Sequence, residues 1–277
     1  MLDLNAWLGK SQTKTATLNL EHAKLLAVTL DVDASSFEEG DALPACWQWA
    51  WFNDALPQSE LGRDGHPKKG GFLPPIELPR RMWAGGNMEI KSPLTIGNKI
   101  TKKTTIKNIV EKSGKSGKLC ILTLSHDFYD QDTLCISEEQ NLVYREDPKS
   151  DAPQAQLITP PNEASIEESV IPHPVLMFRY SALTFNGHRI HYDIDYAREV
   201  EGYPDIVFHA PLTATKLYEL GRKLAQGNKI SRFEYRATAP LFANEPFLIK
   251  GKQQDNTMIL WAETPSGGLA MEAKAYA

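Results

Sequence analysis

The segment APLTATKLYELGRKLAQ, residues 210–226, is followed after a short gap by RFEYRATA, residues 232–239. The first segment repeats apolar residues at the spacing of one helix face, at Ala210, Ala214, Leu217, Leu220 and Leu224. The second alternates apolar with polar residues, which is typical of a half-buried antiparallel strand. A helix wrapped by a curved antiparallel sheet buries both elements at once, so the pair predicts an α+β fold.

The flanking sequence extends this C-terminal module. We predict a strand over residues 176–185, a short helix over residues 193–199 and three or four strands after the long helix. Upstream, residues 147–174 contain six prolines, which disfavour both helix and central strand. We interpret this stretch as a linker between two modules of similar size, residues 1–146 and 175–277.

The N-terminal module follows a similar order. A helical pattern covers residues 18–26, a Gly/Pro-rich loop covers residues 61–79, and strand patterns cover residues 96–112, 120–128 and 142–144. Each half is thus predicted to be a helix followed by an antiparallel meander. Two such units side by side can share one continuous sheet.

Charge and composition narrow the function classes. The net charge is −5 and the pI is about 5.8, which argues against a nucleic-acid binder. Residues 63–118 are locally basic, with thirteen Lys and Arg against four acidic residues. This segment is either a solvated strand face or a rim that meets a phosphorylated ligand such as coenzyme A.

Cysteines and apolar runs indicate the compartment. Three cysteines without metal-ligand spacing predict reduced thiols. We find neither a secretory signal nor an apolar run of membrane-spanning length, so we expect a cytoplasmic protein without membrane contact.

Polar residues concentrate between residues 179 and 209, at Asn186, His188, His191, Asp193 and His209. A histidine on a turn suits proton transfer at neutral pH, which makes His191 the candidate base. The amide of Asn186 can hold a water or a carbonyl. The alternative is structural: a turn capped by Asn186 and a packed histidine. By position, Asp193 is expected to cap the short helix.

The segment FRYSALTFNGHRIHYD, residues 178–193, agrees with the pattern F-[RS]-[YF]-S-A-L-T-F-N-[GA]-H-[RK]-I-H-Y-D. That pattern is typical of one branch of the MaoC-like hydratases and dehydratases, which the chain resembles. The branch contains mesaconyl-C4-CoA (3-methylfumaryl-CoA) and itaconyl-CoA hydratases and mitochondrial 3-hydroxyacyl-thioester dehydratases. The resemblance continues through LGRDGHP (61–67), GGFLPP (70–75) and PRRMWAGG (79–86).

The resemblance implies a double hotdog, with a degenerate substrate-binding unit at 1–146 and a catalytic unit at 175–277. It implies reversible hydration of an α,β-unsaturated acyl-CoA, most specifically itaconyl-CoA or mesaconyl-C4-CoA. His191 would take a proton from water, Asn186 would fix that water, and the backbone N–H of Ala210 would hold the enolate oxygen. Two positions depart from the wider group, which has Asp at 186 and Gly at 210. An amide cannot act as a base, and Ala210 would be strained at positive φ.

Other residues are expected to contact substrate: Arg80, Arg81, Arg189, His188, His209 and Phe72. The arginines suit the free carboxylate of a dicarboxylyl thioester, although Arg80 and Arg81 can equally form structural ion pairs. His188 is the main competitor of His191 for the role of base, and is favoured as its support. Glycines and prolines in loop 64–75 suit a flap over the acyl group. No sequence pattern calls for a metal or another cofactor, and a homo-oligomer is possible.

Two alternatives to this hydratase stay open, and a third lacks a residue that its chemistry needs. The chain can instead be a 3-hydroxyacyl-thioester dehydratase that acts on an acyl carrier protein or CoA in fatty-acid metabolism. A hotdog thioesterase needs a carboxylate to activate water, and Asn186 does not supply one. A non-catalytic acyl-CoA-binding hotdog protein is the option outside enzymes, and the departures at Asn186 and Ala210 keep it open.

Overall fold

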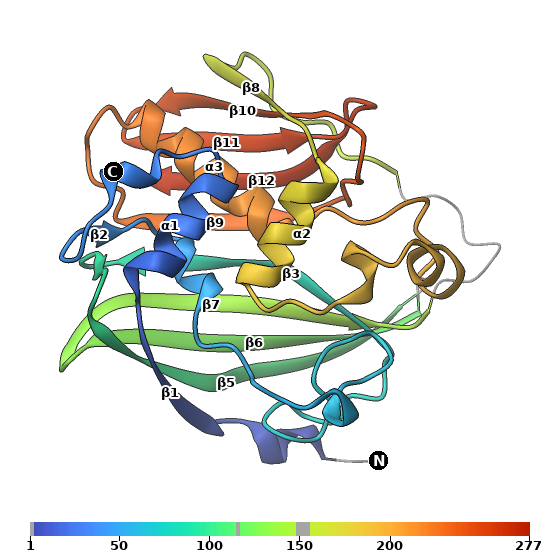
Figure 1. The fold of residues 1–277 in the computed structure, drawn as a ribbon. Helices are drawn as coiled ribbons and strands as arrows, with labels where there is room; N and C mark the ends of the chain where they lie inside the picture. Colours follow the sequence, from blue (N-terminus) through green and yellow to red (C-terminus); the bar gives the residue numbers. More distant parts are fainter. Residues whose placement is uncertain (1–2, 115–116, 148–155) are drawn as a thin grey trace.

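The computed structural model describes residues 3–114, 117–147 and 156–277 of the chain. Its main feature is one antiparallel sheet of ten strands, in the order β1-β5-β6-β7-β3-β9-β12-β11-β10-β8 (Figure 1). The N-terminal half supplies β1 (Ser11–Thr17), β3 (Arg80–Ile90), β5 (Lys99–Gly114), β6 (Gly117–Asp130) and β7 (Thr133–Arg145). The C-terminal half supplies β8 (Ile166–Val170), β9 (Arg232–Ala237), β10 (Phe247–Gln254), β11 (Thr257–Glu263) and β12 (Leu269–Tyr276). A separate two-stranded sheet pairs β2 (Ala42–Leu43) with β4 (Leu94–Thr95).

Three α-helices lie on one side of the large sheet in Figure 1. They are α1 (Leu20–Thr29), α2 (Pro174–Leu183) and α3 (Ala210–Leu224). Short 3-10 turns are η1 (Leu4–Trp7), η2 (Ala34–Ser36), η3 (Trp47–Ala50), η4 (Gln58–Glu60) and η5 (Arg189–His191), and η6 (Tyr196–Val200) is a π-helix. Within the described residues, no helix combines the length and apolar character needed to cross a membrane.

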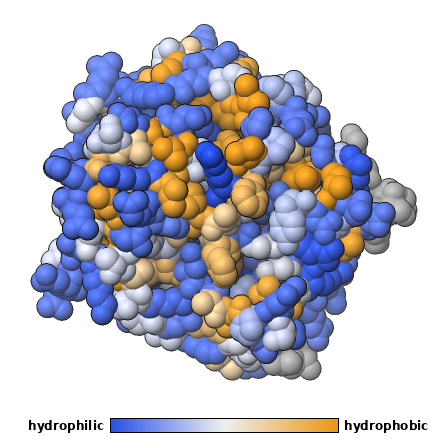
Figure 2. Space-filling model, in the orientation of Figure 1, coloured by the Kyte–Doolittle hydropathy of each residue, from blue (hydrophilic) through white to orange (hydrophobic). Residues whose placement is uncertain are grey.

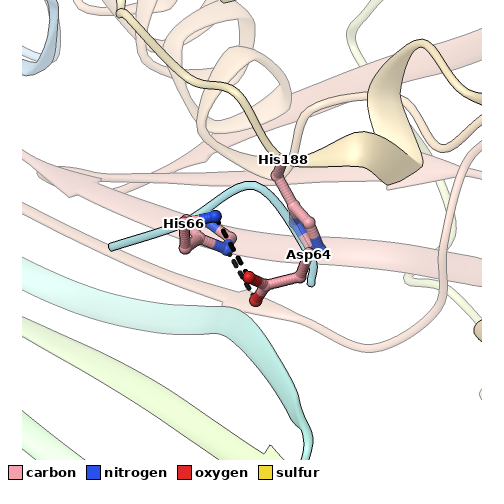
Figure 3. A group of neighbouring side chains, drawn as sticks. All are labelled: Asp64, His66 and His188. Atoms are coloured by element: carbon pink, nitrogen blue, oxygen red, sulfur yellow. Dashed lines mark hydrogen bonds and ion pairs between the residues drawn. The ribbon is translucent and has the colours of Figure 1, made fainter. Parts of the chain in front are cut away.

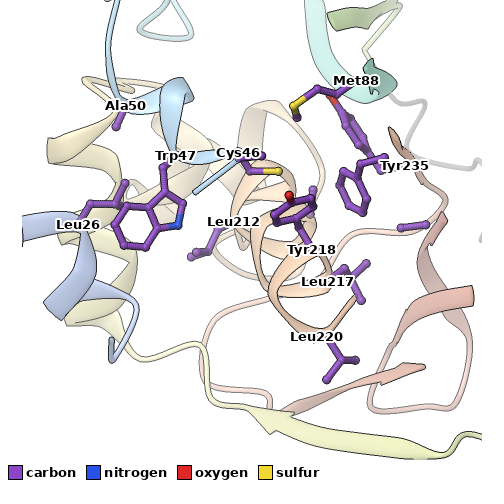
Figure 4. Packing of buried hydrophobic residues seen from close by; sticks show 14 of the residues in the cluster. Leu26, Cys46, Trp47, Ala50, Met88, Leu212, Leu217, Tyr218, Leu220 and Tyr235 are labelled. Atoms are coloured by element: carbon purple, nitrogen blue, oxygen red, sulfur yellow. The ribbon is translucent and has the colours of Figure 1, made fainter. Parts of the chain in front are cut away.

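The predicted long helix is confirmed as α3, and it forms the centre of the C-terminal core. Leu212, Leu217, Tyr218 and Leu220 are buried on it and pack toward Cys46, Met88 and Tyr235 from other elements (Figure 4). Four strands follow α3, as expected. The pattern of a helix wrapped by an antiparallel sheet is therefore correct for this half, and all three cysteines are free and buried.

The two halves join through β3 and β9, which pair antiparallel from Gly85↔Arg236 to Glu89↔Arg232. The strands approach closely because of glycine. A Cβ at Gly85, where φ is +153°, would lie 2.4 Å from the Tyr235 carbonyl oxygen. Trp83 stacks on Tyr235 across the junction, with ring centroids 4.8 Å apart. The expected continuous sheet is thus present.

Two secondary-structure predictions were wrong. The strand predicted over residues 176–185 is instead the greater part of helix α2 and the turn after it, because Pro174 begins a helix well and the His173 ring caps the Val175 N–H at 3.2 Å. The predicted linker contains strand β8, which pairs with β10 at the sheet edge. The strand lies between Pro161 and Pro172, so no proline interrupts its hydrogen bonds. Residues 148–155 of the linker lie outside the described residues, and the division into two modules stays a prediction.

Candidate active site

Helix α2 ends in the turn that carries the candidate site. Phe185 adopts a left-handed φ of +51° and reverses the chain, and the Asn186 N–H donates to the Ser181 carbonyl at 2.8 Å. The Asn186 Oδ1 then accepts from the His188 N–H at 3.0 Å. One amide oxygen of Asn186 therefore shapes the turn, while its Nδ2 has no bond to any described residue and remains available to a ligand.

His191 follows on the 3-10 turn η5 and is held at one nitrogen. Its Nδ1 lies 2.8 Å from the Val207 carbonyl oxygen, which can only accept a hydrogen bond. Nδ1 therefore carries the proton, and Nε2 presents a lone pair. Burial, followed by the neighbouring His188, lowers the pKa of His191 to about 3, so the ring is neutral at neutral pH.

The start of α3 lies against the same ring. His209 is the N-cap of α3, and it stacks on His191 with centroids 3.8 Å apart. Its Nε2 lies 2.7 Å from the Ser181 Oγ, so it ties α2 to α3. Ala210 is the first residue of the helix and does not have positive φ, which removes the strain anticipated there. Its N–H belongs to the first turn, whose donors have no partner within the helix.

His188 is 6% exposed and faces charged groups behind the site. Its Nε2 lies 3.9 Å from a Glu201 carboxylate oxygen, beyond hydrogen-bond range. Glu201 is itself bound by the Arg80 Nε at 2.7 Å and the Tyr196 hydroxyl at 3.3 Å. His188 thus lies between the cavity and the Arg80–Glu201 ion pair, with its ring centroid 5.5 Å from that of His191, and its supporting role stays a prediction.

The three arginines divide into two groups. Arg80 is paired with Glu201, and Arg189 makes two bonds of 2.9 and 2.7 Å to Asp193. Asp193 also accepts from the Tyr196 N–H at 3.0 Å, which confirms its capping role. Arg81 is half-buried and has no ion pair within the described part of the chain. Arg80 thus forms the structural ion pair that was the alternative for Arg80 and Arg81, and Arg189, for which no such pair was predicted, is likewise held by a carboxylate.

An open cavity of about 2510 Å³ collects residues from both halves. Its wall includes Asn186, His191, Ala210, Arg81 and Phe72. On the face shown in Figure 2, apolar residues gather over the region of α1 and α2. Among the exposed large apolar side chains, Val175, Phe178 and Phe185 come from α2 and the turn after it. The cavity thus offers apolar surface beside a small set of polar groups, as ligand sites usually do.

Comparisons with known proteins identify the family of this chain. A family model described as hydroxyacyl-thioester dehydratase type 2 matches residues 46–243. The chain belongs to this family. It is 41% identical to the mesaconyl-C(4)-CoA hydratase of Chloroflexus aurantiacus over 272 residues, which covers 98% of this chain and 96% of that protein. It is 29% identical to the mitochondrial hydroxyacyl-thioester dehydratase type 2 of Schizosaccharomyces pombe, covering 86% and 85%.

Solved structures give the same fold. The MaoC-like dehydratase of Phytophthora capsici matches with a TM-score of 0.69 at 16% identity, covering 99% of this chain and 97% of that one. A Mycobacterium tuberculosis protein described as a double hotdog matches with a TM-score of 0.56 at 13% identity, covering 99% and 97%. This hydroxyacyl-thioester dehydratase type 2 family member is therefore a double hotdog and a hydro-lyase. The alternative of a non-catalytic binding protein is set aside.

Sequence reasoning about this dehydratase family member missed two groups. Asp64 and His66 lie in the matching LGRDGHP segment, yet no role was predicted for them. The structure brings them against His188 (Figure 3). The signal was an acidic residue and a histidine separated by one glycine, a spacing that favours a tight turn with side-chain contact.

Proposed function

We propose that the chain hydrates the double bond of a short dicarboxylyl-CoA thioester, with mesaconyl-C(4)-CoA as the leading candidate substrate. The observation that carries this proposal is the tautomer of His191. Because the Val207 carbonyl fixes the proton on Nδ1, Nε2 is available to take a proton from water. The 41% identity to the hydratase from Chloroflexus aurantiacus, over nearly the whole chain, supports the same substrate.

The other site groups have matching roles. The free Nδ2 of Asn186 donates to the attacking water or to the thioester carbonyl. As the water oxygen bonds to the β-carbon, charge develops on the thioester oxygen. The Ala210 N–H and the first turn of α3 stabilise that charge. His191, Asn186 and the Ala210 N–H all come from the C-terminal half, and residues of both halves line the substrate cavity.

Arg81 is the group that favours a dicarboxylyl substrate over a simple enoyl thioester. Of the three candidate arginines, it alone lacks a carboxylate partner among the described residues, and it lies in the cavity wall. A guanidinium can hold a free carboxylate by two parallel hydrogen bonds. Arg81→Met is expected to raise KM for mesaconyl-C(4)-CoA by about tenfold or more, and to leave KM for crotonyl-CoA within about twofold.

The first test measures loss of enoyl-thioester absorbance with purified protein and mesaconyl-C(4)-CoA, itaconyl-CoA or crotonyl-CoA. We expect rapid turnover of the dicarboxylyl substrates. His191→Ala should lower kcat by about 10²–10⁴-fold without loss of fold. Near-normal turnover by His191→Ala would remove His191 from the mechanism, and activity restricted to crotonyl-CoA would remove the dicarboxylyl assignment.

The second candidate is dehydration of a 3-hydroxyacyl thioester in fatty-acid synthesis. The match to the hydroxyacyl-thioester dehydratase type 2 family favours it. The same site geometry serves both directions, so the acyl group and its carrier make the distinction. Higher kcat/KM with a carrier-protein thioester than with the CoA thioester would support this candidate.

A further inference from the structure

Hydration requires two proton transfers, one from water and one to the α-carbon. His191 accounts for the first in the proposed function, on which this inference rests. The amide of Asn186 cannot act as an acid or a base at neutral pH. The second proton-transfer group must therefore be another side chain that reaches the same cavity.

The loop that includes Asp64 and His66 comes from the N-terminal half and docks directly on the catalytic turn. The Arg189 N–H donates to the Asp64 carbonyl at 2.9 Å, and the Arg189 side chain donates to the Arg63 carbonyl at 3.2 Å. Gly65 has a φ of +87°, and a Cβ there would lie 2.0 Å from the Gly187 carbonyl oxygen. The contact depends on glycine, and it places the loop beside Asn186.

Asp64 holds His66 at two points. Its Oδ1 accepts from the His66 N–H at 3.0 Å, and its Oδ2 lies 3.0 Å from the His66 Nδ1 (Figure 3). A carboxylate accepts hydrogen bonds, so Nδ1 carries the proton and Nε2 is free. The His66 side chain is 23% exposed and lines the cavity. Its ring centroid lies 4.3 Å from that of His188.

We propose that His66, positioned by Asp64, is the second proton-transfer residue of the reaction and serves the α-carbon. In hydration, the neutral His191 Nε2 takes a proton from water as the water oxygen bonds to the β-carbon, and the C=C electron pair moves to the thioester oxygen. That pair then returns to form the α-C–H bond with the proton of the His66 imidazolium. A proton passing from the His191 ring to the His66 ring through solvent resets both, and dehydration is the reverse.

The environments of the two histidines suit this division. The partner of His191 is a neutral carbonyl, whereas the partner of His66 is a carboxylate that stabilises an imidazolium. Burial, followed by the charge of Arg81, lowers the pKa of His66 to about 3, and Asp64 opposes that shift. A substrate carboxylate beside Arg81 would offset its charge and make His66 more basic in the complex.

A divalent cation is the competing occupant of this cluster. The donor atoms of Asp64, His66 and His188 lie within 4.8 Å of one another. The existing Asp64–His66 hydrogen bond and the nearby positive charge of Arg81 favour proton sharing instead. Activity is therefore expected to survive prolonged treatment with a chelator. Activity lost to the chelator and restored by Zn²⁺ would overturn the proposal.

The decisive measurement is exchange of the α-proton of the hydrated product thioester in D₂O, followed by mass spectrometry. His66→Gln should lower both exchange and hydration by about 10²–10⁴-fold with little change in KM. Asp64→Asn should lower both by a smaller factor. His191→Ala should block hydration yet retain exchange, because it leaves His66 in place. Glu77→Gln, an exposed change near the end of loop 61–79 and outside the cavity wall, is the matched control and should behave as wild type.

The outcomes separate the two proposals. Wild-type protein that hydrates none of the three thioesters would overturn the proposed function and this inference with it. Active wild-type protein, with exchange unchanged in His66→Gln or lost in His191→Ala, would overturn only the role of His66. A thermal melt of each variant identifies any loss that comes from unfolding.

Discussion

The two halves share one sheet but fill its inner face differently. In the C-terminal half, the fifteen-residue helix α3 buries eight residues, and the strands beneath it present apolar side chains such as Phe233, Met258 and Leu260. In the N-terminal half, α1 has only ten residues, and the cavity wall includes Lys102, Thr104, His126 and Gln140. A long helix with an apolar face packs on the sheet of one half, whereas the other half presents a polar wall to the cavity that both halves line.

That polar wall is internally bonded. Thr104 lies 2.9 Å from the His126 Nδ1, and the His126 Nε2 lies 3.3 Å from the Gln140 Oε1. Deeper in the same half, Glu138 accepts from Trp49 at 3.0 Å and from Tyr235 at 3.1 Å. Buried polar groups that are paired in this way avoid the free-energy penalty of unsatisfied burial. The two halves therefore use the inner face differently: α3 and its strands form an apolar core in the C-terminal half, and the N-terminal half adds a bonded polar wall to the shared cavity.

The largest expected effect on stability comes from the C-terminal core. Leu217→Ala removes a fully buried side chain from α3, and should lower the free energy of unfolding by about 2–5 kcal/mol. Urea denaturation followed by circular dichroism measures this change. Leu25→Ala, at a side chain 54% exposed on α1, is the control and should change stability by under about 0.5 kcal/mol. Equal losses at both positions would contradict the comparison.

The contact between the halves is tested next. Gly65→Ala forces a Cβ into the Gly187 carbonyl and should lower kcat/KM by about 10–100-fold, by pushing the loop off the catalytic turn. Gly70→Ala is the matched control, because φ there is +96° and the nearest atom lies 3.7 Å away. Gly70→Ala has the same unfavourable positive φ as Gly65→Ala, but its Cβ meets no backbone atom. Similar activity of the two variants would show that the contact does not affect catalysis.

Acid should destabilise both halves through buried histidines. Burial lowers the pKa of His126 and of His209 well below 6.5 in the folded state. Below about pH 6.5 the unfolded chain therefore binds more protons, and folding stability falls as pH falls, by about 1.4 kcal/mol per pH unit for each group. Urea unfolding at a series of pH values gives this slope. His126→Gln should reduce this slope by the contribution of one histidine. An unchanged slope would show that His126 does not contribute to the acid sensitivity.

The smallest expected effect concerns Lys102 on the polar wall. Its ammonium lies near the rings of Phe52 and Phe128, at 6.0 and 5.5 Å, and burial lowers its pKa to about 8. Lys102→Met keeps the length of the side chain and should change the free energy of unfolding by less than about 1 kcal/mol. A decrease in the free energy of unfolding above about 2 kcal/mol would show that this lysine contributes to folding stability and does not only line the cavity.

Local periodicity in the sequence was sufficient for much of the fold. The spacing from Ala210 to Leu224 specifies α3, because a 3.6-residue period places those side chains on one face whatever they pack against. The alternation in β9 works in the same way. The turn carrying Asn186 and His191 was also located from the sequence, because the polar residues and the matching motif occur in one short segment.

Only the tertiary structure decided which partner each charged group found. Arg80 meets Glu201, 121 residues away, whereas Arg81 has no carboxylate partner among the described residues. The Asp64–His66 pair reaches the turn that carries Asn186 through a contact between two glycines of different halves. Side-chain periodicity is a property of neighbours along the chain, whereas charge pairing and proton transfer depend on distances that exist only after the sheet has joined both halves.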